Sequence, residues 1–67
     1  MPKKIRDLLA DLRKAGFELD RQRGSHRQFK HSKIEGVITI SGNEGHDAKR
    51  YQERQVAQVI AKSQQDN

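Results

Sequence analysis

Cysteine, tryptophan and long hydrophobic runs are all missing from this 67-residue chain. Without cysteine there is no disulfide framework and no thiolate to bind a metal. The N-terminal stretch MPKKIRDLL lacks the continuous apolar run of a signal peptide or a membrane span. We therefore expect a soluble, cytoplasmic protein that does not interact with a membrane.

Hydrophobic residues make up only 31% of the chain and aromatic residues 4%. So short a polypeptide buries only about 60% of its unfolded surface, and it supports one core rather than two. We therefore expect a single domain over residues 1–67, with marginal stability. The polar segment from about Ser63 onward is expected to be a disordered tail.

The whole chain has a formal net charge of +5, and the positive charge is concentrated in its first half. Five cations without an intervening acid lie between residues 21 and 34: Arg21, Arg23, Arg27, Lys30 and Lys33. Such a cluster suits a polyanionic partner, although basic surfaces are often merely solvated. The charge pattern favours a nucleic acid as partner but says nothing about chemistry.

A helix is predicted at each end of the chain. The first runs from about Pro2 to Ala15, since its apolar residues share one face and Gly16 is placed to end it in a left-handed conformation. The second follows Asp47, a candidate cap, and its apolar stripe is formed by Val56, Val59 and Ile60.

Between the helices the apolar period changes to two, which is typical of strands. Phe17 and Leu19 share one face of a short first strand, and Arg23-Gly24-Ser25 forms a turn. The second strand runs from His26 to His31, with Arg27, Phe29 and His31 toward the core and His26, Gln28 and Lys30 away from it.

A second turn is predicted over Ser32 to Gly36, followed by the most β-prone run, Val37 to Ile40, as the central or best-covered strand. The element order is therefore α-β-β-β-α. Short connections make the three strands an antiparallel meander, and both helices bury their stripes on one sheet face. The predicted class is a two-layer α+β fold with one open sheet face.

His26 is the candidate for chemistry, because it follows a Gly-Ser turn and has cations on both sides. Histidine titrates near neutrality, so it can take a proton from a ribose 2′-hydroxyl or give one to a departing 5′-oxygen. Neighbouring cations would stabilise charge on the phosphorane. A turn histidine that binds phosphate as a neutral donor is the alternative, and Gly24 and Ser25 have a plain role in the turn.

A metal site is not expected from the three histidines. His26 and His31 are five residues apart, so on one strand they point to opposite faces, and His46 has only Asp47 as a nearby carboxylate. We expect neither a metal nor another cofactor. His31 and His46 are better interpreted as a sheet-packing and a surface histidine.

The segment from Ile5 to Ile40 resembles the HicA family of messenger-RNA interferases. The resemblance rests on Lys-Ala-Gly-Phe after the first helix, on RGSHRQFKH over residues 23–31, and on the Val-Ile-Thr-Ile strand. It implies a fold like the double-stranded-RNA-binding domain, endoribonuclease activity on messenger RNA with His26 as catalytic residue, and a HicB-like antitoxin as partner. The chain departs from the family pattern after Ile40.

The leading hypothesis is therefore a toxin that cleaves RNA without a metal. Its expected RNA contacts are Arg21, Arg23, Gly24, Ser25, Arg27, Lys30 and Lys33. A non-catalytic RNA-binding module is the main alternative, since this fold class also recognises duplex RNA by shape. A regulatory partner that only holds the antitoxin is a third.

Overall fold

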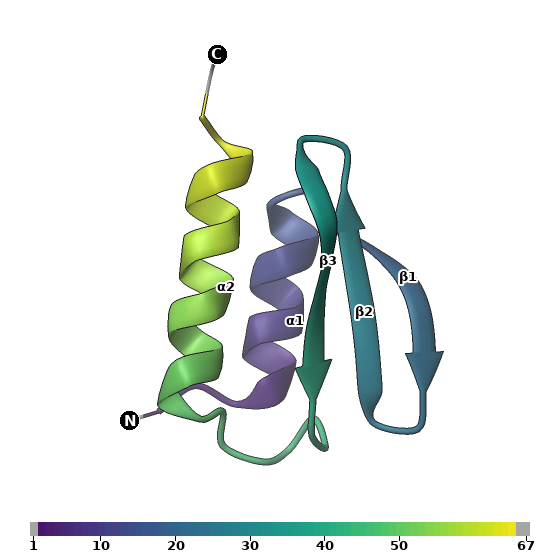
Figure 1. Ribbon diagram of the computed structural model, residues 1–67. Helices are drawn as coiled ribbons and strands as arrows, with labels where there is room; N and C mark the ends of the chain where they lie inside the picture. The colour runs from purple at the N-terminus through teal and green to yellow at the C-terminus, as the bar shows by residue number, and fades with distance from the viewer. Residues whose placement is uncertain (1, 66–67) are drawn as a thin grey trace.

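The structure is a computed structural model that describes residues 2–65 (Figure 1). Its elements are α1 (Ile5–Lys14), β1 (Glu18–Arg23), β2 (His26–His31), β3 (Ile34–Ser41) and α2 (Arg50–Ser63). The strands form one antiparallel sheet in the order β1-β2-β3, and both helices lie on one side of it (Figure 1). The predicted α+β class and element order are confirmed.

The core fills the space between the helices and the sheet. One face of α1 is fully buried, and Phe17, two strands and α2 supply the other large side chains of the core. The core side chains are Ile5, Leu8, Leu9, Leu12, Phe17, Phe29, Ile38, Ile40 and Val56. Full burial of one such aliphatic or aromatic side chain stabilises the fold by about 1.5–3 kcal/mol. The opposite sheet face has no layer over it within residues 2–65 (Figure 1).

Helix α1 begins at Ile5, three residues later than the sequence predicted, so Pro2 lies outside it. The residues before the helix pair instead with the segment that precedes α2: Lys4 forms an isolated antiparallel bridge with Asp47, and Ala48 N–H donates to the carbonyl of Lys3 at 2.7 Å. These tertiary contacts keep the residues before Ile5 out of the helix.

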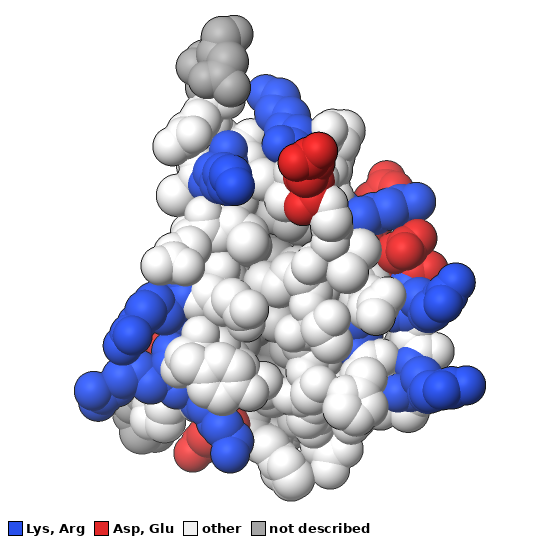
Figure 2. Space-filling model, viewed as in Figure 1, with Lys and Arg blue, Asp and Glu red and all other residues white. Residues whose placement is uncertain are grey.

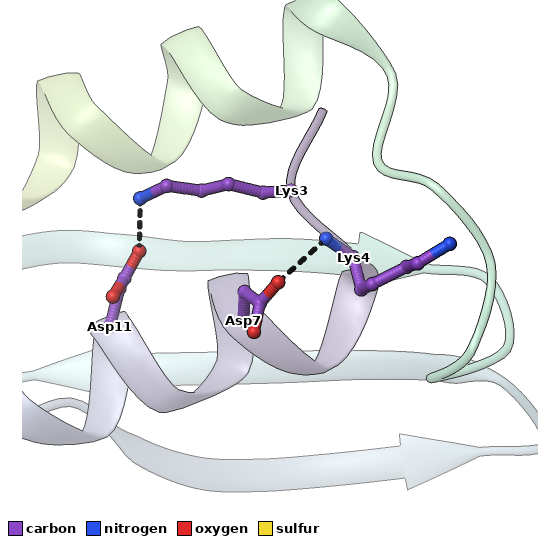
Figure 3. A network of polar contacts seen from close by, with 4 residues as sticks. All are labelled: Lys3, Lys4, Asp7 and Asp11. Atoms are coloured by element: carbon purple, nitrogen blue, oxygen red, sulfur yellow. Dashed lines mark hydrogen bonds and ion pairs between the residues drawn. The ribbon is translucent and has the colours of Figure 1, made fainter. Parts of the chain in front are cut away.

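Charged side chains fix the start of α1 (Figure 3). The Asp7 carboxylate accepts the backbone N–H of Lys4 at 2.8 Å, and Lys3 Nζ lies 2.7 Å from Asp11 Oδ2. This hydrogen bond to Asp11, together with its charge, raises the pKa of Lys3 above its usual value. Both contacts are solvent-exposed, so each contributes little to stability.

Helix α2 begins at Arg50, and the prediction of Asp47 as its cap is wrong. The side-chain oxygen of Gln52 accepts the backbone N–H of Lys49 at 2.8 Å, so this N–H group at the start of the helix has a hydrogen-bond partner. Asp47 instead pairs with Lys4 Nζ at 2.6 Å, and this contact holds the pKa of its carboxyl below the usual range.

The C-terminal end of α2 extends into the predicted tail. Ser63 is the last helical residue, its side chain is buried, and its hydroxyl donates to the carbonyl of Ile60 at 2.7 Å. Residues 66–67 of the predicted tail lie outside the described residues. Neither helix in residues 2–65 is long and apolar enough to cross a membrane.

β1 lies at the sheet edge farthest from α2, which explains why Leu19 is 44% exposed (Figure 1). Leu19 pairs with Phe29 and shares its face, but no helix covers that end of the sheet. β3 is the other edge strand and packs against both helices, so it is best covered but not central. β3 begins at Ile34, so the predicted turn over Ser32 to Gly36 extends too far. Gly36 lies within the strand, with φ 78°, where the register with β2 is irregular.

Candidate active site

Three polar side chains form a row across the open face of the sheet. The Cα partner of His26 is Arg23 on β1 and Ser41 on β3. Directly paired residues project to the same face of a sheet, so these side chains are neighbours. Arg27 follows His26 and Ile40 precedes Ser41, and both are buried on the side of the helices. Because successive residues of a strand face opposite ways, the row lies on the side facing solvent.

A second row lies next to the first. Gln28 pairs with Arg21 on β1 and with Thr39 on β3, again with the three side chains on the open face. Both rows, apart from Ser41, line a shallow hollow with a volume of about 640 Å³, to which Gln22 also contributes. The hollow therefore combines one imidazole with two guanidinium groups.

The imidazole of His26 is held by a residue that sequence reasoning did not find. Its Nδ1 lies 2.6 Å from the hydroxyl oxygen of Ser41, which is 15 residues away along the chain. A hydroxyl can donate to a neutral ring nitrogen or accept from a protonated one, so this contact serves both charge states of the ring. The Nε2 atom on the other side of the ring remains available to a substrate.

Ser41 is itself anchored to the helical layer. Its backbone carbonyl accepts a hydrogen bond from the side-chain amide of the buried residue Gln52 at 2.9 Å. The same Gln52 side chain caps α2, so the end of β3 is tied to the start of that helix. This second contact supports the geometry of the His26–Ser41 pair.

Gly24 and Ser25 form the two-residue turn between β1 and β2, directly before His26. Gly24 has φ 58°, a left-handed value that glycine adopts without cost and that a type II′ hairpin requires at its first position. The carbonyl of Ser25 accepts the backbone N–H of Gly42 at 3.2 Å. In this structure the two residues shape the backbone beside His26.

Arg27 was also expected to be an RNA contact, but it faces the core, as the alternation along β2 predicted. Its side chain points to the core face with Phe29, and the residue is only 8% exposed. Its guanidinium donates to the carbonyl of Ser25 at 3.2 Å and to that of Gly42 at 2.9 Å. On the sheet face that packs against the helices, Arg27 thus connects the β1–β2 turn to the end of β3.

Lys30 and Lys33 lie away from the hollow. Lys30 is four residues along β2 from His26, a separation of about 13 Å, and its Nζ is 3.5 Å from Asp20 Oδ1. Lys33 is in the turn at the opposite end of the sheet. Figure 2 shows blue side chains with red ones among them along the edge where Figure 1 places β1. The basic cluster of the sequence is therefore divided, and Arg21 and Arg23 are the members beside His26.

The other two histidines have separate surroundings. His31 packs against Phe17 with ring centroids 4.7 Å apart, and its Nδ1 accepts the backbone N–H of Lys33 at 3.0 Å. Its Nε2 therefore carries the hydrogen and donates to the carbonyl of Ala15 at 3.2 Å. His46 is exposed in the segment before α2. Within residues 2–65, no three His, Cys, Asp or Glu side chains gather as a metal site.

The fold and the site define a two-layer α-β-β-β-α domain with an exposed histidine beside two arginines of β1 on its open sheet face. A family model described as the HicA toxin of bacterial toxin-antitoxin systems matches residues 5–62. The chain belongs to this HicA toxin family, whose toxins act in pairs with an antitoxin. The match extends beyond Ile40 through most of α2, farther than the resemblance seen in the sequence. Comparisons with curated proteins and with solved structures gave no match.

Proposed function

We propose that the protein is an endoribonuclease toxin that cleaves messenger RNA and uses His26 for proton transfer. One observation carries the proposal: Ser41 holds the His26 ring at 2.6 Å, in a hollow that is also lined by Arg21 and Arg23. An oriented imidazole beside cations is the arrangement that RNA phosphodiester cleavage needs. The family relationship supports the same activity.

The reaction begins when the ribose 2′-oxygen attacks the adjacent phosphorus. His26 takes the 2′-hydroxyl proton at Nε2, the bond from phosphorus to the 5′-oxygen breaks, and the 5′-oxygen leaves with a proton. The products are a 2′,3′-cyclic phosphate and a 5′-hydroxyl. His26 is the one histidine among the described residues that line the hollow, so in this proposal water supplies the proton of the leaving 5′-oxygen.

Arg21 and Arg23 stabilise the charge that develops on the phosphorane. Proton transfer by a positioned side chain typically contributes about 10² to 10⁴ in rate. The alternative role for His26 is that of general acid: a protonated ring gives its proton to the leaving 5′-oxygen, and water takes the 2′-hydroxyl proton. The Ser41 hydroxyl bonds to either form of the ring, so it supports both roles.

The cleavage needs no metal or cofactor, because the nucleophile is part of the RNA and its activation requires only a base. To test the reaction, purified protein is incubated with single-stranded RNA in excess chelator, and the product ends are identified. We expect 2′,3′-cyclic or 3′-phosphate ends together with 5′-hydroxyls. Activity that disappears in chelator and returns with magnesium or zinc would contradict this mechanism.

The same experiment separates the alternatives. RNA affinity without cleavage would favour a non-catalytic RNA-binding module. Protein with neither affinity nor cleavage would favour a partner that only holds the antitoxin. Cleavage supports the proposed toxin.

The partner that we propose is a HicB-like antitoxin that covers the hollow around His26. Acidic groups on the antitoxin would complement Arg21 and Arg23, which have no ion pair within residues 2–65. Toxin in the complex should then be inactive and should regain activity when the antitoxin is degraded. A complex that still cuts RNA would rule out this mode of inhibition.

A further inference from the structure

Gln28 occupies the centre of the second row with its amide unused by the protein. The residue is half-buried between Arg21 and Thr39 and lines the same hollow as His26. No hydrogen bond of its side chain to the rest of residues 2–65 is found, although the Gln22 side chain makes one and the Gln52 side chain makes two. The amide donor and acceptor of Gln28 can therefore bond to a ligand that enters the hollow.

The position of Gln28 relative to His26 matches the spacing of a nucleic acid chain. The two residues are on the same face of β2, two positions apart, which is about 7 Å along the strand. This distance is comparable to one nucleotide step in an extended single strand. When the scissile phosphate lies at His26, a base of a flanking nucleotide lies at Gln28.

We propose that Gln28 reads an adenine next to the scissile phosphate, which rests on the ribonuclease function proposed above. A carboxamide offers one donor beside one acceptor, and adenine presents the complementary pair on both its Watson–Crick and its Hoogsteen edge. In duplex DNA, glutamine commonly makes this two-bond contact with N6 and N7 of adenine. Adenine is therefore the base that we expect Gln28 to contact.

Arg21 provides the second contact of this base site. The chain has three aromatic residues, of which Phe17 and Phe29 are buried in the core and Tyr51 is on α2. None of them lines the hollow. A guanidinium plane can stack on a base as an aromatic ring does, while the N–H groups in that plane still donate to a phosphate. Arg21 therefore holds the base whose edge Gln28 reads and keeps its phosphate contact.

The test uses four single-stranded RNAs that differ in one nucleotide within a uridine background. For the parent protein we expect cleavage beside adenine with kcat/KM about 5- to 150-fold above the other three, since one bidentate base contact discriminates by about 1–3 kcal/mol. Gln28→Ala should remove this preference, and so should Gln28→Met, which keeps the volume of the side chain. Gln58→Ala on α2 is the matched control and should retain it.

Binding of the same RNAs is measured with His26→Ala protein, with and without Gln28→Ala. Adenine-selective binding that depends on Gln28 would support the base site even if the parent protein cut no RNA, and the proposed catalysis alone would then fail. Parent protein that cuts or binds all four RNAs equally would overturn the inference. So would an adenine preference that survives in folded Gln28→Ala and Gln28→Met variants.

Discussion

Removal of the Arg27 guanidinium tests whether this residue is structural, as its contacts indicate. The buried cation donates to the carbonyls of Ser25 and Gly42, at the end of the sheet where His26 and Ser41 lie. Hydrogen bonds from a charged group contribute about 1.5–3 kcal/mol each, and water will partly replace them in a variant. We expect Arg27→Ala to lower the free energy of unfolding by about 2–4 kcal/mol.

That loss is large for this protein. A domain of 67 residues has a total stability of roughly 3–10 kcal/mol, and one kcal/mol moves the melting temperature by about 4–8 °C. Thermal melting followed by circular dichroism should therefore show Arg27→Ala to melt roughly 10–30 °C below the parent protein. The matched control is Arg23→Ala, an exposed arginine, which should change stability by no more than about 0.5 kcal/mol.

The reasoning would be refuted if Arg27→Ala and Arg23→Ala melted at the same temperature. A loss of RNA affinity without any loss of stability in Arg27→Ala would restore the original assignment of this residue as an RNA contact. Arg27→Lys refines the test, because an ammonium group lacks the planar fork of a guanidinium. It should melt between the parent protein and Arg27→Ala.

Three further predictions concern the groups around the hollow. RNA affinity should fall steeply with salt: the logarithm of the binding constant should change with the logarithm of the salt concentration with a slope of about −0.7 per neutralised phosphate. The Arg21→Ala, Arg23→Ala double variant should reduce the size of this slope by about two such units, while Lys33→Ala should leave it unchanged. His31→Ala should lower the melting temperature more than it lowers activity per folded molecule, and the reverse pattern would give His31 a direct role. Ser41→Ala should reduce kcat by up to about 100-fold with little change in KM or melting temperature, and Ser41→Thr should restore part of it; an unchanged rate would refute the positioning role.

The helices could be predicted because their apolar residues follow a regular period, whereas the run from Val37 to Ile40 belongs to an edge strand and the central strand is β2. β2 runs from His26 to His31 as predicted, since alternation and the Gly24 turn mark both its ends. The starts of the helices could not be predicted in the same way. The early start at Pro2 and the cap at Asp47 were both wrong because contacts between these two distant segments decide where each helix begins.

The candidate site was only partly predictable for a similar reason. His26 follows from the family motif, and Arg21 and Arg23 lie close to it in the sequence as well as in space. Ser41 was missed because its place beside His26 depends on the register between β2 and β3, which is irregular near Gly36. Arg27, Lys30 and Lys33 belong to the same basic cluster of the sequence, but alternation along β2 turns Arg27 to the core and the length of the sheet separates Lys30 and Lys33 from His26.

The central claim is that the imidazole of His26 performs the chemistry, and the most direct test is the rate of RNA cleavage by folded His26→Ala protein. His26 is exposed on the open face, so its removal leaves no buried cavity and the melting temperature should stay close to that of the parent. His46→Ala, another exposed histidine outside the hollow, is the matched control. We expect cleavage to fall by at least about 10²-fold in His26→Ala and to be unchanged in His46→Ala. Folded His26→Ala protein that cuts RNA at the parent rate would contradict the account.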